Sequence, residues 1–134
     1  MVDSREISVD TSRRQLADLT DEVRQFCDGR GNGLLHVFAP HATAGLALME
    51  MGAGSDTDLV GFLDRLLPRD DRYRHRHGSP GHGADHLLPA LLSPSLVIPV
   101  VNGRPALGIW QHVVLVDLNP DNPSRQVRLS FVAG

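Results

Sequence analysis

The fold of this chain is decided by the stretch Ser95-Leu-Val-Ile-Pro-Val-Val-Asn-Gly-Arg-Pro-Ala-Leu-Gly-Ile-Trp-Gln-His-Val-Val-Leu-Val-Asp117. Apolar and β-branched residues dominate both halves, and Asn102-Gly103 separates them with the residues that two-residue hairpin turns prefer. The stretch therefore predicts a β-hairpin whose first arm is residues 95–101 and whose long second arm is residues 104–117. Gly108 within the long arm indicates a bulge or a close approach of backbone.

Further strands are predicted on both sides of this hairpin. Residues 125–132 alternate polar and apolar side chains, as in a strand with one solvated face. Residues 6–9 alternate in the same way, and the almost wholly apolar run 33–39 is typical of an inner strand. A second apolar run, 46–51, follows after a break of small residues.

Helices are predicted where apolar residues recur at helical spacing. Ser12-Arg-Arg-Gln15 reads as a capping box, and the apolar positions from Leu16 to Phe26 continue it as one amphipathic helix. A second helix is expected from Ser55 to Pro68, and a short one at residues 87–92. Two or three helices and about six or seven strands predict an α+β fold, a largely antiparallel β-sandwich in a single domain, residues 1–134.

Composition narrows the classes of partner. Among 134 residues, 41% are hydrophobic and 22% are charged, which is typical of a globular protein. Aromatic residues make up only 4% and the net charge is −3, so no nucleic-acid partner is expected. Cys27 is the only cysteine, which excludes an internal disulfide. No apolar run approaches the roughly 20 residues of a membrane helix, so we expect a cytoplasmic protein without a membrane partner.

The first candidate for chemistry is the segment His75-Arg-His-Gly-Ser-Pro-Gly-His-Gly-Ala-Asp-His86, which holds four of the seven histidines. Imidazole is a preferred ligand of zinc, and a catalytic zinc usually keeps three protein ligands. His82 and His86 share one face if a helix begins near His82, whereas His75 and His77 must fold back from the preceding loop. Asp85 is a candidate ligand or acceptor for a ring N–H. A solvated, flexible loop is the alternative.

Other polar residues are weaker candidates. His41 follows a strand and is flanked by small residues that leave room for a ligand. Glu50 ends the next apolar run and is the second carboxylate of interest. We expect Trp110 to lie in the core and Asp117 to cap a turn. The sequence contains no phosphate-binding glycine loop, no Cys-x-x-Cys pair and no His-Glu-x-x-His motif.

Three segments together resemble the YjbQ-like family, also known as the secondary thiamine-phosphate synthase enzyme family. They are His41-Ala-Thr-Ala-Gly-Leu46 with Glu50, Asp85-His86 leading into Ala90-Leu-Leu-Ser-Pro-Ser95, and Asn102-Gly-Arg-Pro-Ala-Leu-Gly-Ile-Trp-Gln111. The resemblance implies a homotrimer of small α+β sandwiches with a histidine-lined, often metal-containing site between subunits. It also implies a weak activity that joins hydroxymethylpyrimidine diphosphate to thiazole phosphate.

Carried over residue by residue, the resemblance matches family motifs at His41, Glu50, His86, Trp110 and Gln111. Together with the histidine segment, it leads us to expect the catalytic residues His41, Glu50 and His86; the substrate-binding residues Thr43, Arg104 and Gln111; and the metal ligands His41, His82 and His86. The implied cofactor is a divalent metal, zinc first, with magnesium as the choice for a diphosphate, and the implied substrate is a phosphorylated small molecule. Ala42, Met49 and Ala84 depart from the family pattern, which puts the polar surroundings and the reaction in doubt.

Two rival functions use the same residues. Metal-assisted hydrolysis needs a metal that lowers the pKa of a bound water to about 7. A non-catalytic trimer that binds a metal or a metabolite needs no reaction at all, because histidines near a metal do not specify one.

Overall fold

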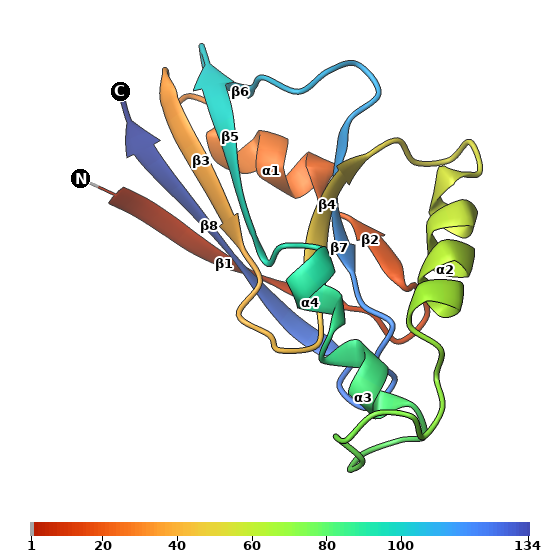
Figure 1. Ribbon diagram of the computed structural model, residues 1–134. Helices are drawn as coiled ribbons and strands as arrows, with labels where there is room; N and C mark the ends of the chain where they lie inside the picture. The colour runs from red at the N-terminus through yellow and green to blue at the C-terminus, as the bar shows by residue number, and fades with distance from the viewer. Residues whose placement is uncertain (1) are drawn as a thin grey trace.

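The computed structural model describes residues 2–134, which form two antiparallel sheets and four helices (Figure 1). The larger sheet has the strand order β1-β8-β3-β5-β6, with bounds β1 Val2–Asp10, β8 Ser124–Ala133, β3 Gly33–Phe38, β5 Ser95–Val101 and β6 Arg104–Pro105. The smaller sheet has the order β2-β7-β4, with bounds β2 Leu16–Asp18, β7 His112–Val116 and β4 Gly45–Met49. The helices are α1 Thr20–Cys27, α2 Ser55–Leu66, α3 His82–Asp85 and α4 Leu88–Leu91. The predicted α+β class is confirmed.

The main core lies between the two sheets and includes α1. The alternation predicted for the last strand holds, because Val127, Leu129 and Phe131 of β8 point into this core. They meet Val113 and Leu115 of the smaller sheet in one cluster of buried residues. Each fully buried aliphatic or aromatic side chain stabilises the fold by about 1.5–3 kcal/mol.

A second, smaller core covers the other face of the smaller sheet. Leu63 of α2 and Leu88 of α4 pack there against Val114 and Val116 of β7. Strand β7 is therefore buried on both faces, which explains its unbroken apolar sequence. Figure 1 shows α2 lying along this outer side of the smaller sheet.

The predicted hairpin is confirmed at its turn but not along its second arm. Asn102 and Gly103 both have positive φ, 50° and 75°, as a type I′ turn requires. Strand pairing with β5 ends at Pro105. The N–H of Ala106 still donates to Pro99 O at 2.8 Å, but Pro99 has no backbone N–H to return, and the chain then leaves the larger sheet. Residues 106–111 cross to the smaller sheet, so the expectation of one long arm over 104–117 was wrong. Gly108 lies in this crossing, where Gln111 N donates to Gly108 O at 3.0 Å.

The first helix begins later than predicted. Leu16 pairs with Val116 as part of strand β2, so the helix expected from the capping box at residues 12–15 was wrong over its first half. The chain turns into α1 at Asp18, whose Oδ1 accepts the backbone N–H of Thr20 at 3.0 Å. The two later helices are confirmed, α2 at residues 55–66 and α4 at residues 88–91.

The expectation that Trp110 lies in the core was also wrong. Its side chain is 67% exposed, and that of Ile109 is 86% exposed, because both lie in the crossing between the sheets rather than in a strand. Among residues 2–134, no helix is long and apolar enough to cross a membrane.

Candidate metal site

The histidine-rich loop folds back onto α3 because two glycines allow close backbone contact. Gly81 has φ of 80°, and a Cβ at this position would meet Cα of Arg69 at 2.6 Å. A Cβ on Gly83 would meet Cβ of Tyr73 at 2.6 Å and the carbonyl oxygen of His75 at 2.7 Å. Only glycine fits at either position without a shift of the backbone. This packing brings His75 back to the histidines of α3.

Three imidazoles converge at this point. His75, His82 and His86 each offer a ring nitrogen, and the three atoms lie within 4.8 Å of one another. His82 Nε2 is 3.1 Å from His86 Nε2, as expected for residues one helical turn apart. The ring of His77 lies 3.9 Å from that of His75 between centroids, although His77 is not a member of the group.

One nitrogen of this cluster is left without a partner. Nδ1 of His75 is buried and makes no hydrogen bond with the described residues. Nδ1 of His82 lies 3.0 Å from Oδ2 of Asp121, which is ion-pair distance, but the contact lacks hydrogen-bond geometry. An unsatisfied buried polar atom costs about 1–3 kcal/mol. Three converging ring nitrogens in a cluster that holds buried nitrogens without a hydrogen-bond partner fit a divalent metal.

The cluster favours neutral imidazole, the form that binds a metal. Burial lowers the pKa of His75, and the neighbouring His77 and His82 lower it further. Burial and the other three histidines of the segment likewise lower the pKa of His86. A proton on one ring repels a proton on the next, so the lone pairs stay available at neutral pH.

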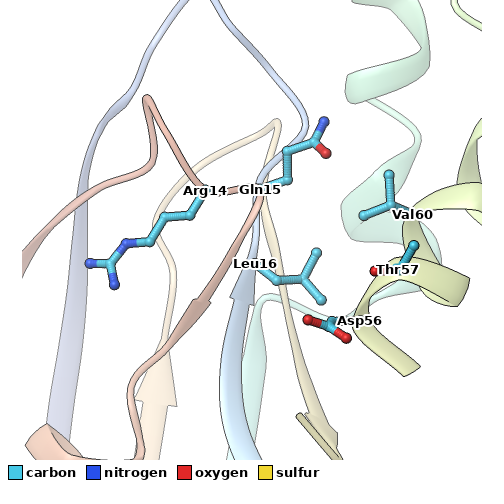
Figure 2. Close-up of a pocket in the computed structure, with 6 residues that line it drawn as sticks. All are labelled: Arg14, Gln15, Leu16, Asp56, Thr57 and Val60. Atoms are coloured by element: carbon cyan, nitrogen blue, oxygen red, sulfur yellow. The ribbon is translucent and has the colours of Figure 1, made fainter. Parts of the chain in front are cut away.

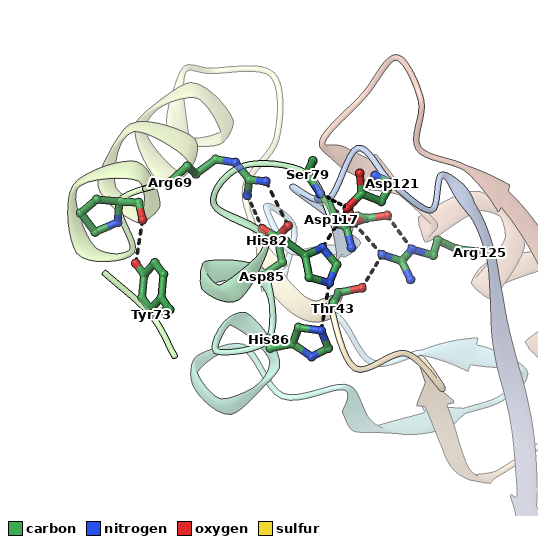
Figure 3. Close-up of polar contacts among 12 residues, drawn as sticks. Thr43, Arg69, Tyr73, Ser79, His82, Asp85, His86, Asp117, Asp121 and Arg125 are labelled. Carbon is green, nitrogen blue, oxygen red and sulfur yellow. Dashed lines mark hydrogen bonds and ion pairs between the residues drawn. The ribbon is translucent and has the colours of Figure 1, made fainter. Parts of the chain in front are cut away.

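Two carboxylates support the cluster from outside (Figure 3). Asp85, expected as a ligand or as an acceptor for a histidine ring, instead forms a two-pronged ion pair with Arg69, with Nη2 to Oδ2 at 3.1 Å. It is 2% exposed and ties α3 to the beginning of the loop that follows α2. Asp121 faces His82 and accepts the backbone N–H of Ser79 at 2.9 Å. Asp121 was not predicted as a site residue from the sequence.

Two of the three converging histidines, His82 and His86, line a cavity of about 390 Å³ at one end of the two sheets. His75 instead lines a neighbouring cavity of about 250 Å³ that it shares with His82. The lining of the larger cavity also includes His41 and Thr43. His41 lies just beyond β3, and its Nε2 is 3.0 Å from the backbone nitrogen and 2.9 Å from the carbonyl oxygen of Gln126. It therefore caps the strand edge where β3 has ended, and it is not part of the converging group.

A buried ion pair forms the wall of this cavity. Arg125 is 1% exposed and binds Asp117 through Nε to Oδ2 at 2.7 Å and Nη2 to Oδ1 at 3.0 Å. Nη2 also donates to Oγ1 of Thr43 at 2.7 Å. The expected turn cap is confirmed, since Asp117 Oδ1 accepts the N–H of Asn119 at 3.0 Å. Arg125 was not predicted as a site residue from the sequence. The signal for its burial was that Arg125 lies on the same face of β8 as the buried apolar residues of that strand.

The structure places the remaining predicted residues elsewhere. Glu50 follows Met49, which pairs with His112 at one end of the smaller sheet. Gly45, and Thr43 just before it, lie at the opposite end. Gln111 precedes His112 at the same end as Glu50. Arg104 lies on β6 beside a separate cavity of about 600 Å³ next to α1. Within one chain, the structure thus brings together His41, Thr43, His82 and His86 but not Glu50, Arg104 or Gln111.

Another hollow, of about 210 Å³, lies between β2 and the first turns of α2 (Figure 2). It is lined by Arg14, Gln15, Leu16, Asp56, Thr57 and Val60. The Arg14 side chain points away from the others, so no set of polar groups converges there. We therefore place the candidate site at the histidines.

Sequence comparison agrees with this architecture. Residues 5–134 match the family model described as UPF0047 protein YjbQ-like. The chain belongs to this YjbQ-like family. A UPF0047 protein of Mycobacterium tuberculosis H37Rv is 65% identical over 133 residues, covering 99% of this chain and 100% of the relative. One from Archaeoglobus fulgidus is 32% identical over 91% of this chain and 96% of its own length.

Solved structures of YjbQ-like proteins share the fold. A YbjQ-like protein of unknown function from Sulfolobus solfataricus P2 superposes with a TM-score of 0.92 at 26% identity, covering 100% of this chain and 99% of the other. A hypothetical protein from Aeropyrum pernix K1 gives a TM-score of 0.87 at 34% identity, with coverage of 98% and 99%. The family resemblance inferred from the three sequence segments is therefore confirmed.

Proposed function

We propose that this YjbQ-like protein binds a divalent metal ion, zinc in the first place, at His75, His82 and His86. The proposal rests on the rings of these three histidines, each of which has one nitrogen within 4.8 Å of the other two. In addition, Nδ1 of His75 is buried and has no hydrogen-bond partner among the described residues. Three histidine ligands with a fourth position open toward a cavity are the usual arrangement of a catalytic zinc. When bound, such an ion supplies Lewis acidity toward a phosphoryl oxygen. His41, expected as a ligand, borders the cavity in this proposal and is replaced by His75.

The reaction that fits best is transfer on a phosphorylated small molecule, with thiamine-phosphate synthesis from hydroxymethylpyrimidine diphosphate and thiazole phosphate as the specific proposal. Magnesium is the alternative ion for a diphosphate. His86 and His41, which both line the cavity, would then contact the substrate, and Thr43 lines the same cavity and links it to the buried ion pair through Arg125.

We also propose that the protein works as a cytoplasmic homotrimer. Glu50, Arg104 and Gln111 lie too far along the sheets to reach the histidines of their own chain, so a neighbouring subunit has to supply them if they act at all. The larger sheet leaves a face uncovered, on which Val97 is 60% exposed. An exposed apolar face of this kind is a candidate for subunit contact.

A non-catalytic metal-binding role is the second candidate. Neither carboxylate expected at the site is available there, because Asp85 is occupied by Arg69 and Glu50 is at the far end of the smaller sheet. Metal-assisted hydrolysis, the third candidate, needs a general base for water. Asp121, which lines the cavity and faces His82, is the carboxylate that would have to serve.

The metal content of untagged protein tests the proposal. After incubation with zinc and desalting, we expect near-stoichiometric zinc in wild type and its loss in His82→Ala. His36→Ala is the matched control, because His36 lies on β3 and bonds Ser95 Oγ at 2.6 Å, outside the cluster. Wild type that retains no zinc would contradict the proposal.

Activity separates the candidates. Zinc-loaded wild type and His86→Ala are compared for thiamine phosphate formed from the two precursors, and for release of product from a panel of phosphate and ester substrates. Synthesis that is lost in the variant supports the synthase, whereas hydrolysis of one panel member supports the hydrolase. Bound zinc with turnover at background in both proteins leaves the non-catalytic role.

A further inference from the structure

Arg125 turns one nitrogen of its guanidinium group toward the cavity. Its Nε and Nη2 are engaged by Asp117 and Thr43, as Figure 3 shows. The third nitrogen, Nη1, makes no hydrogen bond with any residue from 2 to 134. Nη1 does not belong to the fully buried atoms without a hydrogen-bond partner in the described chain, so it is not closed off from solvent. Arg125 forms part of the cavity wall. The side chain thus keeps one free donor where a ligand could reach it.

The surrounding contacts hold this donor in one orientation. The Asp117 side chain is 0% exposed and binds one edge of the planar guanidinium group, from Nε to Nη2, through both of its oxygens. Thr11 Oγ1 donates to Asp117 Oδ2 at 2.6 Å and so fixes the carboxylate in turn. A guanidinium group held in this way loses little side-chain entropy when it binds an oxyanion. Nη1 is therefore a preorganised donor.

Other polar groups on the same wall suit an oxygen-rich anion. Thr43 Oγ1 accepts its hydrogen bond from Arg125, so the hydroxyl proton remains free to donate. Asn119 uses its amide oxygen for the backbone N–H of Asp121 at 2.7 Å, which leaves its NH₂ group. The one carboxylate on the wall, Asp121, is held by Ser79 N–H and faces His82. The negative charge of Asp121 therefore lies beside His82.

We propose that Arg125 Nη1, with the hydroxyl of Thr43, binds a phosphate group of the ligand beside His82 and His86. A tetrahedral phosphate offers oxygens in several directions, so one can take the Arg125 donor while another faces the histidines. The inference deepens the proposed function and rests on it for the second contact, the metal ion. The contact with Arg125 itself needs no metal. Arg125 replaces Arg104 as the anion-binding arginine of the chain.

The variants must separate this contact from folding. Arg125→Lys keeps a cation for Asp117 but removes Nη1. If that variant does not fold, the double variant Arg125→Met with Asp117→Leu removes both charges, and exchange of a buried ion pair for apolar residues is often tolerated. The matched control is Arg128→Lys, since Arg128 lies on the same strand but is half exposed and pairs with Glu6 at 3.2 Å.

The test is calorimetric titration with inorganic phosphate, with zinc and without it, beside the zinc content of each protein. We expect phosphate to bind wild type and Arg128→Lys equally, and binding to weaken about tenfold or more in Arg125→Lys or the double variant while zinc content is unchanged, as for the loss of a charge-assisted hydrogen bond. Equal phosphate affinity in wild type and the Arg125 variant, or no phosphate binding to wild type in either arm, overturns the inference. Absence of zinc from wild type overturns the proposed function instead, and the metal-free arm still decides the role of Arg125.

Discussion

At the scale of single residues, His41 shows how a candidate catalytic group also serves the fold. Its Nε2 lies beside both the N–H and the carbonyl oxygen of Gln126, where Pro40 would have paired in a longer β3. A neutral ring satisfies one of these groups at a time. Burial lowers the pKa of His41 from its ordinary value of 6.5, and the charge of Arg125 lowers it further. The ring is therefore held neutral.

This lowered pKa predicts a loss of stability in mild acid. The folded state resists a proton that the unfolded chain accepts, so the contribution of His41 is full above about pH 6.5 and is lost as the pH falls through the lowered folded pKa. We expect the free energy of unfolding, measured with urea on metal-free protein, to fall between about pH 7.5 and about pH 5.5. His41→Gln keeps an amide for Gln126 and removes the titration, so its free energy should fall less. An identical fall in both proteins would refute the prediction.

The sequence predicted that the histidines of this segment lie close together, but not which of them converge. The crowding of His75, His77, His82 and His86 is visible in the sequence, and the i and i+4 spacing of the last two anticipates their shared face on α3. Which other histidine joins them depends on how the loop packs at Gly81 and Gly83. That packing is a three-dimensional contact with Arg69 and Tyr73, which no local pattern records.

At the scale of elements, patterns identified strands and helices better than their partners. The alternation of β8 and the turn residues of the hairpin are local signals, and both are confirmed. Segment 16–18 was predicted as part of a helix, and segment 112–116 as part of the long hairpin arm. Their apolar residues would be buried equally well in those elements and in the strands that they form. Pairing of β2 with β7 in a second sheet decides the matter, and it joins residues about a hundred positions apart.

The contact between β4 and the end of α4 supports the cavity and gives a prediction. A Cβ on Gly45 would meet the carbonyl oxygen of Leu92 at 2.2 Å. We expect Gly45→Ala to lower the free energy of unfolding by about 1–3 kcal/mol, the usual cost of overpacking, because this backbone contact must open. Thermal and urea unfolding measure it.

Gly61→Ala is the control, and the opposite sign is expected for it. A Cβ there meets only Arg65 Nη1, at 3.6 Å, and alanine is the better residue inside α2 by about 1 kcal/mol. Equal stability of Gly45→Ala and wild type would show that the contact with α4 is loose.

At the scale of the whole molecule, the two faces of the larger sheet differ. The inner face builds the main core, whereas no helix or strand of residues 2–134 covers the outer face, where Leu34 of β3 lies opposite Val132 of β8. Val97 and Val101 of β5 are exposed there too. The alternation of polar and apolar residues in β8 predicted a solvated face. This face nevertheless exposes several apolar side chains, as a surface for subunit contact would.

These side chains predict where the proposed homotrimer is held together. If subunits meet at this face, a charge at its centre must be buried without a partner, which opposes association. We expect light scattering after size exclusion to give the trimer mass for wild type and the monomer mass for Leu34→Glu with Val97→Glu. Leu66→Glu is the control, because Leu66 is equally exposed but lies on α2, away from this sheet. A trimer that survives in the double variant would place the contact elsewhere, with the exposed Ile109 and Trp110 as the next positions to change.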